Sequence, residues 1–279
     1  MKLRCRDHVL PLDRTLIMGV LNVTPDSFSD GGLYFEPAAA VERGLEMVEE
    51  GADIIDVGGE STRPGAVDVP EEEELRRVIP VLRGLAGAGV PLSIDTRKAE
   101  VARSGLEAGA AILNDTLGEE TQRGTDEMAA ESGAAMVVMH SRGSPATMRS
   151  LTDYDDVVLH VRVFLKERGQ ELERVGVAPE SIVLDPGIGF AKTPAQNLEL
   201  LRRLGELVDV GRPILVGTSR KSFIGQVLDL PEDQRVEGTL ASVCWAVAKG
   251  ARIVRVHDVK ETKRAVRLTE AIAAAGIHE

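Results

Sequence analysis

Eight short apolar runs recur along the chain, and each is followed at once by polar residues and then by a stretch long enough for a helix. The runs are Thr15–Leu21, Ile54–Val57, Leu92–Ile94, Ala111–Leu113, Ala135–Met139, Ile182–Leu184, Ile214–Val216 and Arg252–Val254. This order of strand, polar loop and helix predicts a closed parallel barrel of the eight-fold (β/α) type, the TIM barrel. All eight loops then lie on one rim, where the active sites of this fold are found.

The length of the chain agrees with that fold. It has 279 residues, and eight-fold barrels typically have about 250. No linker, low-complexity tract or internal repeat is visible, so we expect one domain over residues 1–279. The residues before Thr15 have no partner helix, and we expect them to form a short N-terminal hairpin that closes the bottom of the barrel.

Composition and charge indicate the cellular compartment and exclude some classes of binding partner. No run of 18 or more apolar residues is present, and the first residues lack the apolar core of a signal peptide. Two cysteines, Cys5 and Cys244, are too few for a disulfide framework or a zinc site. The net charge of −12 argues against binding to nucleic acid. We therefore expect a cytoplasmic protein without membrane or nucleic-acid partners.

The spacing of apolar residues between the runs predicts eight helices. Their expected ranges are Pro37–Glu50, Glu71–Leu85, Arg97–Ala108, Thr125–Ser132, Asp155–Val175, Pro194–Leu204, Arg235–Gly250 and Val259–Ala275. The acidic run Glu71–Glu74 suits the first turn of a helix, and we interpret it as solvated surface.

The predicted helix Arg235–Gly250 is unusual because residues 240–248 are apolar on almost every side. A helix on the outside of a barrel needs only one apolar stripe. A second apolar face indicates that another protein surface buries it, so we expect this helix to contact a partner subunit in a homodimer.

Three polar residues follow different runs and are expected to converge in one pocket. Asp95, Asn114 and Asp185 would offer fixed acceptors and one amide, and Lys221 could meet a carbonyl. This set matches the donor-rich edge of an aminopyrimidinone such as guanine or a pterin. The alternative is that these residues cap helices, as the sequence Asp95-Thr96-Arg97 suggests.

A second constellation is cationic and suits a diphosphate. Positive side chains follow three runs, at Arg63, at Arg220 with Lys221, and at Arg255 with His257. Asn22 offers a neutral oxygen suited to Mg²⁺, a cation that keeps most of its waters and binds phosphate oxygens.

The sequence around Lys221 invites comparison with two other chemistries. Residues 217–222 lack the spacing of a P-loop, so we reject that interpretation. A Schiff-base lysine, with its pKa lowered by the neighbouring Arg220, remains a minor alternative.

Aromatic residues are scarce, yet Phe28, Tyr34, Phe35 and Phe190 fall in predicted rim loops beside glycines. This placement suggests lids that grip a flat apolar group, although ordinary loop packing explains Tyr34 and Phe35 equally well.

Five motifs, in order, carry a resemblance to a known family. They are residues 22–32 (NVTPDSFSDGG), 56–65 (DVGGESTRPG), 185–190 (DPGIGF), 219–222 (SRKS) and 255–258 (RVHD). Together they resemble dihydropteroate synthases over nearly the whole chain, from about Thr15 to Leu268. Ala191 departs from the pattern, because the family usually has glycine there.

The resemblance implies a homodimeric barrel enzyme, a transferase of folate biosynthesis. It would join 6-hydroxymethyl-7,8-dihydropterin diphosphate to 4-aminobenzoate with Mg²⁺ as cofactor, giving 7,8-dihydropteroate and pyrophosphate, and sulfonamides would be expected to inhibit it. Asn22 would hold the metal ion. Catalysis would rest on Asp95, Asp185, Lys221 and Arg255.

The resemblance also divides the substrate-binding residues among three subsites. The pterin would bind to Asp95, Asn114, Asp185 and Lys221. The diphosphate would bind to Thr62, Arg255 and His257, and the aminobenzoate to Phe28, Pro64, Phe190 and Ser222. Arg63 is added to the diphosphate subsite because of its charge alone.

Two rival functions use the same pterin pocket. A folate-dependent methyltransferase barrel would not need the cations at Arg63, Arg255 and His257. A non-catalytic pterin-binding paralogue would be expected to have lost Asn22 or the lid residues, and both are present here.

Overall fold

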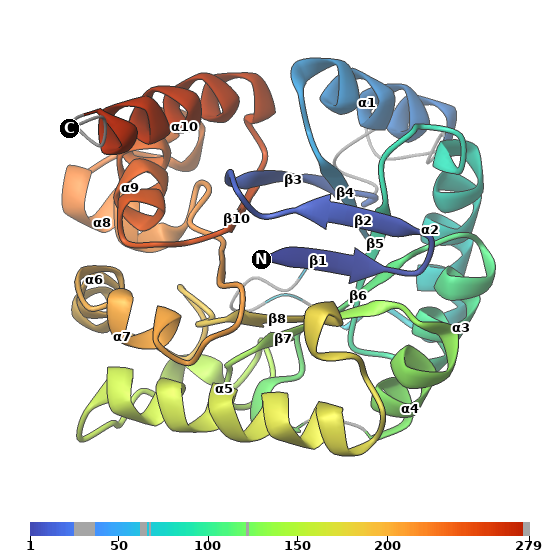
Figure 1. Ribbon diagram of the computed structural model, residues 1–279, viewed down its shortest axis with the longest axis horizontal. Helices are drawn as coiled ribbons and strands as arrows, with labels where there is room; N and C mark the ends of the chain where they lie inside the picture. The colour runs from blue at the N-terminus through green and yellow to red at the C-terminus, as the bar shows by residue number, and fades with distance from the viewer. Residues whose placement is uncertain (25–36, 62–65, 67, 121–122, 276–279) are drawn as a thin grey trace.

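A ring of parallel strands surrounded by helices forms the body of the molecule (Figure 1). The computed structural model describes residues 1–24, 37–61, 66, 68–120 and 123–275. Its strands are β1 (Lys2–Cys5), β2 (His8–Pro11), β3 (Leu16–Asn22), β4 (Ile54–Gly58), β5 (Leu92–Thr96), β6 (Ile112–Asp115), β7 (Ala135–Met139), β8 (Ile182–Asp185), β9 (Leu215–Val216) and β10 (Ile253–Val256).

The eight parallel strands form the predicted barrel. They pair in the order β8-β7-β6-β5-β4-β3-β10-β9. A parallel bridge between Leu184 and Ile214 joins the two ends of this order. The TIM-barrel prediction is therefore confirmed.

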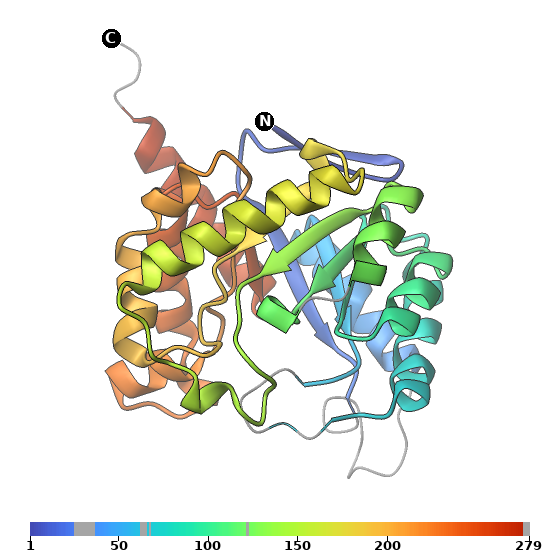
Figure 2. The same ribbon diagram turned by 90° about the horizontal axis from the view of Figure 1, so that it is seen from below.

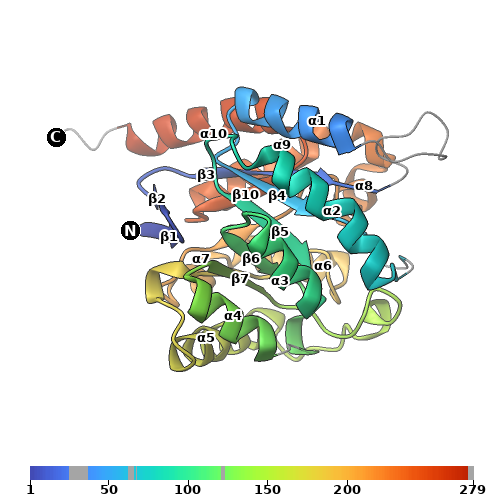
Figure 3. The ribbon, with the colours of Figure 1, turned by 90° about the vertical axis from the view of Figure 1, so that its right-hand side faces the viewer.

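Helices cover the outside of the ring, and Figure 3 shows α1 to α4 along one side of it. The described helices are α1 (Pro37–Glu50), α2 (Glu71–Leu85), α3 (Ala99–Glu107), α4 (Arg123–Ser132), α5 (Val157–Arg174), α6 (Pro194–Arg202), α7 (Gly205–Val208), α8 (Ser222–Leu228), α9 (Val236–Ala248) and α10 (Val259–Ala274). The bounds predicted for α1 and α2 are those observed, and the other six differ by a few residues. The short helices α7 and α8 were missing from the predicted set.

Alternation along the strands separates two apolar layers. Side chains such as Ile55, Val57 and Ile94 face the helices and belong to one large buried cluster. Side chains such as Ile54 and Ile112, of the opposite parity, fill the barrel with a second cluster. The interior is thus a packed core, as in other barrels of this type.

The N-terminal hairpin lies across one end of the barrel (Figure 2). Strands β1 and β2 pair antiparallel, and Leu3, Cys5 and Leu12 join the interior cluster. Arg6 donates to the carbonyls of Leu106 and Ala110, which lie ahead of β6. The hairpin therefore closes the amino end of the barrel, as predicted, and leaves the carboxyl end for the polar loops.

One surface expectation is wrong in part. Glu74, in the first turn of α2, is fully buried. It accepts a 2.7 Å hydrogen bond from Thr96 Oγ1 and forms an ion pair with Lys98. The fourth position of the acidic run thus turns inward to the end of β5, while Glu71 and Glu72 are exposed.

Among the described residues, no helix combines the length and the apolar character needed to cross a bilayer.

Candidate active site

Polar side chains gather inside the barrel at the carboxyl ends of its strands. They come from β4, β5, β6, β8 and β10 and from the loop before α8, and we call them the polar layer. Its members are Asp56, Asp95, Asn114, Asp185, Lys221 and Arg255. The acidic members are buried and lie on the inward-facing parity of their strands. Asp95 stands above the apolar interior cluster, and Asp56 lies one inward-facing position lower, level with Ser93 and Ile112.

Arg255 joins two of these carboxylates. Its Nε donates to Asp56 Oδ2 at 2.6 Å, and its Nη2 donates to Asp95 Oδ2 at 2.7 Å. Burial disfavours the guanidinium charge, but Asp56 and Asp95 outweigh that effect and raise the pKa of Arg255 above its usual value. Arg255 is therefore a permanent cation in the middle of the layer.

Asp95 is held beside Arg255 and is not a helix cap. Helix α3 starts at Ala99, after Lys98 as its N-cap residue. Burial raises the pKa of Asp95 to about 7, although Arg255 opposes the shift. Its Oδ1 is buried and has no hydrogen-bond partner in the described part of the chain. A buried oxygen of this kind is suited to accept an N–H group from a ligand.

Asp185 and Lys221 form the other side of the layer. Asp185 Oδ1 accepts the amide N–H of Gly187 at 2.7 Å, and burial raises the pKa of its carboxyl. Burial, with the charge of Arg255, lowers the pKa of Lys221 to about 8, while Asp185 opposes the shift. Its ammonium donates to the carbonyl of Ile188 and lies 4.5 Å from the centre of the Phe190 ring.

Arg220 does not act on Lys221 in the way that the Schiff-base alternative assumed. Its guanidinium pairs with Asp258 at 2.5 Å and 3.1 Å. Its amide N–H donates to Thr239 Oγ1 at 3.0 Å. The pKa of Lys221 falls because of burial and Arg255.

Asn22 and His257 meet at the ends of the neighbouring strands β3 and β10. Asn22 Nδ2 lies 3.4 Å from His257 Nε2, and His257 Nδ1 lies 2.9 Å from Ser219 Oγ. With its amide nitrogen turned to His257, Asn22 directs its carbonyl oxygen elsewhere. A single neutral oxygen fits Mg²⁺ that takes its other ligands from water and phosphate.

The predicted aminobenzoate residues are placed only in part. Ser222 is the first residue of α8 and is exposed. It borders a hollow of about 510 Å³ with Gly225, Gln226 and Arg235. Phe28, Thr62, Arg63 and Pro64, together with Tyr34 and Phe35, lie outside the described residues.

Two buried residues with clear contacts were missed at the sequence level. Asp56 lay hidden inside an apolar run, although it shares the inward parity of Gly58. Lys192 Nζ donates to the carbonyls of Phe190 at 2.9 Å and of Gly187 at 3.0 Å. Together with its contact to the carbonyl of His140, these bonds tie the segment that carries Phe190 to the end of β7. For Asp56, the available signal was a charged residue inside an apolar run.

Ala191 adopts a backbone conformation that favours glycine. Its φ is +47°, in the left-handed region where a side chain is strained. This geometry explains why the family pattern has glycine at this position.

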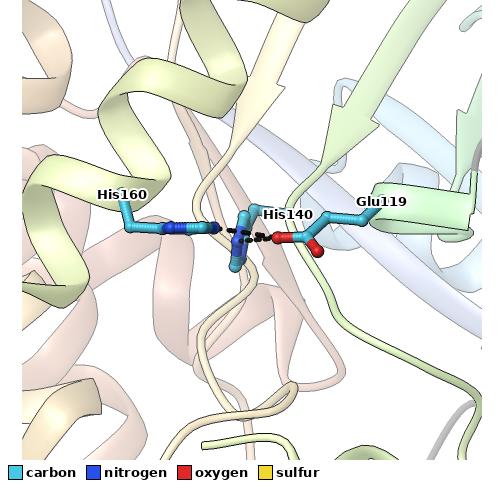
Figure 4. Close-up of side chains that lie close together, drawn as sticks. All are labelled: Glu119, His140 and His160. Carbon is cyan, nitrogen blue, oxygen red and sulfur yellow. Dashed lines mark hydrogen bonds and ion pairs between the residues drawn. The ribbon is translucent and has the colours of Figure 1, made fainter. Parts of the chain in front are cut away.

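A separate polar cluster consists of Glu119, His140 and His160, whose side chains point toward one another (Figure 4). Glu119 Oε1 lies 3.5 Å from His140 Nε2 and 2.8 Å from His160 Nε2. Two imidazoles and a carboxylate are a ligand set known for zinc.

The protein's own cations already surround this cluster. Arg142 Nε donates to the same oxygen of Glu119 at 3.1 Å, and Lys192 Nζ lies 3.0 Å from His140 Nδ1. Burial and the charge of Lys192 lower the pKa of His140 to about 3, so positive charge is disfavoured there. We therefore describe the cluster as a hydrogen-bonded network around the ion pair of Glu119 and Arg142, and we assign no metal to it.

Comparison with known proteins gives consistent matches. The family model described as "Pterin binding enzyme" matches residues 18–257. Dihydropteroate synthases of Synechocystis sp. and Escherichia coli K12 are 49% and 47% identical to this chain, covering 93% and 99% of it and 90% and 98% of their own lengths.

Solved structures agree with these matches. A Yersinia pestis dihydropteroate synthase with a sulfonamide drug complex has a TM-score of 0.92 at 44% identity, covering 99% of this chain and 100% of its own. The Xanthomonas albilineans enzyme with 7,8-dihydropteroate has a TM-score of 0.88 at 42% identity, covering 98% and 99%. The chain belongs to the dihydropteroate synthase family.

Proposed function

We propose that the polar layer binds the pterin ring of 6-hydroxymethyl-7,8-dihydropterin diphosphate in the dihydropteroate synthase reaction. The observation that carries this assignment is one buried layer with three oxygen-bearing side chains, Asp95, Asn114 and Asp185, beside the cations Lys221 and Arg255. A pterin presents ring N–H and amino donors next to a carbonyl. The carboxylates accept the donors, and Lys221 donates to the carbonyl.

The diphosphate is proposed to lie between Arg255 and His257, with Thr62 and Arg63 from the loop after β4. Asn22 would hold Mg²⁺ beside the phosphate oxygens, a role that its contact with His257 Nε2 supports. When bound, Mg²⁺ would supply charge stabilisation to the leaving pyrophosphate.

The aminobenzoate is proposed to bind where Phe190 and Ser222 approach the same rim, together with Phe28 and Pro64. The ring of Phe190 lies against the Lys221 ammonium, and this contact supports a subsite next to the pterin. Sulfonamides resemble aminobenzoate and are proposed as inhibitors. The Yersinia pestis relative was solved with a sulfonamide drug complex.

The chemistry follows from charge. An arylamine is unprotonated near neutral pH, so the step needs no general base, and departure of pyrophosphate is the difficult part. Arg255 and His257 stabilise the charge that develops on the leaving group. Asp95 and Asp185 favour positive character on the pterin methylene. Rim loops that exclude water prevent hydrolysis.

A homodimer is proposed through α9. Its exposed residues Ala241, Trp245 and Ala248 are spaced as one stripe of the helix, while Val243 and Ala246 are buried against the barrel side. We further propose that residues 1–279 act as one pterin-binding domain. A cytoplasmic location is proposed because Cys5 and Cys244 are both free thiols.

A product assay tests the function. Purified protein is mixed with the pterin diphosphate, 4-aminobenzoate and Mg²⁺, and 7,8-dihydropteroate is separated and quantified, with each component omitted in turn. The proposal expects product only in the complete mixture. Tight pterin binding without product would favour the non-catalytic paralogue.

A further inference from the structure

Asp56 is a buried carboxylate in the middle of β4 to which the proposed subsites give no role. It is 0% exposed, and it pairs in register with Ser93 of β5, one inward-facing layer below Asp95. One of its oxygens, Oδ2, accepts hydrogen bonds from Arg255 Nε at 2.6 Å and from Asn114 Nδ2 at 3.1 Å. A single oxygen thus holds two residues of the polar layer.

The contact with Asn114 fixes the orientation of its amide. An amide oxygen turned to the Asp56 carboxylate would place two acceptors together, whereas the amide nitrogen makes a hydrogen bond. Because Nδ2 is held at Asp56, Oδ1 is the end of the Asn114 amide that is turned away from Asp56, and we infer that it faces the ligand. Asn114, which taken alone can donate or accept, is therefore held as an acceptor.

The contact with Arg255 fixes the plane of the guanidinium. Nε is bonded to Asp56 and Nη2 to Asp95, so two nitrogens of the planar group are held by carboxylates from neighbouring strands. Asp56 thus orients two residues of the polar layer: the amide of Asn114 and the guanidinium of Arg255.

We propose that Asp56 is a positioning residue, which holds Asn114 so that it accepts a hydrogen bond from the ligand. The pocket then prefers a pterin, with its 2-amino group, to the analogue with a 2-oxo group. The inference rests on the proposed function, because it assumes that the pterin ring lies in this layer. With Asp95, Asn114 and Asp185 all directed as acceptors, a carbonyl in place of the amino group meets acceptors only. Freeing the Asn114 amide lets it rotate and donate to that carbonyl.

Calorimetry with two probes tests this role. Affinities for 6-hydroxymethylpterin and for its 2-oxo analogue, 6-hydroxymethyllumazine, are measured for the wild type, Asp56→Asn and Asp56→Val. Asp56→Asn keeps an oxygen acceptor for Asn114, and Asp56→Val removes it. Asp53→Val is the matched control, because Asp53 is a carboxylate paired with Arg14 ahead of the same strand, at the amino end of the barrel.

We expect Asp56→Val to weaken pterin binding about tenfold and to reduce the preference for pterin over lumazine about fivefold, as loss of one positioned acceptor implies. Asp56→Asn and Asp53→Val should keep the wild-type preference. Asp56→Ala, which also removes the acceptor for the Asn114 amide, replaces Asp56→Val if that variant does not fold, and it should reduce the preference in the same way.

An unchanged preference in Asp56→Val, or in Asp56→Ala where that variant replaces it, would overturn the inference and leave the proposed function standing. An equal loss of preference in Asp56→Asn would also overturn it. If the wild type bound neither probe, the assignment of the pterin to this layer would itself be wrong.

Discussion

Arg255 Nη2 lies 2.7 Å from Asp95 Oδ2, so a residue proposed for the diphosphate is bonded to one proposed for the pterin. The two subsites therefore share an ion pair. Substitutions that break one shared contact have non-additive effects. We expect Arg255→Lys and Asp95→Asn to lower kcat/KM with a coupling energy of about 1–3 kcal/mol.

A double-mutant cycle in steady-state kinetics measures this coupling. The control cycle combines Asp95→Asn with Arg14→Lys, at the opposite end of the barrel, and should be additive within about 0.5 kcal/mol. Additive effects of Arg255→Lys and Asp95→Asn would mean that the ion pair has no part in catalysis.

Lys221 should make pterin binding sensitive to alkaline pH. Burial and Arg255 lower the pKa of its ammonium to about 8, so the charged donor is lost as the pH rises through that value. We expect the KM for the pterin diphosphate to rise about tenfold between pH 8 and pH 9.5. Steady-state kinetics across this range check it, and Lys221→Arg, which stays charged, should remove the rise. A constant wild-type KM up to pH 9.5 would contradict the role.

The same pKa shift has a consequence for stability. The folded protein releases the Lys221 proton near pH 8, whereas an unfolded lysine keeps it to about pH 10.5. The unfolded state therefore binds more protons between these values. The contribution of this group to the free energy of unfolding should increase across that window.

The ring of elements could be predicted because alternation of strand and helix leaves little choice of topology. The residues at which the strands end could not be predicted in this way. The apolar runs stop at Ile94 and Leu113, but β5 and β6 continue through Asp95 and Asn114. Polar residues end an apolar pattern in the sequence without ending the strand, since these side chains face the interior.

The sequence predicts that Asp95, Asn114 and Asp185 lie close together, but it does not predict their contacts. Asp95, Asn114 and Asp185 follow different runs and do share one layer. The pairing of Arg255 with Asp56 joins β10 to β4 across 199 residues, and no local spacing indicates it. Glu74 was misjudged for the same reason, because its buried partner Thr96 comes from β5.

Ala191 offers a test of backbone strain. Its φ of +47° costs about 1–2 kcal/mol for a residue with a side chain, and glycine loses part of that gain by loosening the unfolded chain. We expect Ala191→Gly to raise the free energy of unfolding by about 0.5 kcal/mol, measured by urea denaturation. Ala102→Gly, inside α3, should lower it by about 1 kcal/mol. Destabilisation by Ala191→Gly would contradict the strain.

The exposed stripe on α9 predicts the oligomeric state. Figure 1 shows α9 beside α10 on the outside of the barrel, and Trp245 is 48% exposed. We expect the wild type to sediment as a dimer at micromolar concentration and Trp245→Glu to give monomers, because the charge would be buried in the interface. Leu159→Glu, at a similarly exposed apolar position on α5, should leave the dimer intact. A monomeric wild type would end the dimer proposal.

Asp185 is the residue at which a change of one acceptor atom tests whether the polar layer binds the pterin. In Asp185→Asn the amide oxygen can still accept the Gly187 N–H, as Oδ1 does at 2.7 Å. The second carboxylate oxygen, Oδ2, is replaced by an amide nitrogen, so an acceptor becomes a donor. Calorimetric affinity for 6-hydroxymethylpterin should fall by about 1–3 kcal/mol, and Asp229→Asn, at the exposed end of α8, should bind as the wild type does. Equal affinity of Asp185→Asn and the wild type would contradict the placement of the pterin in this layer.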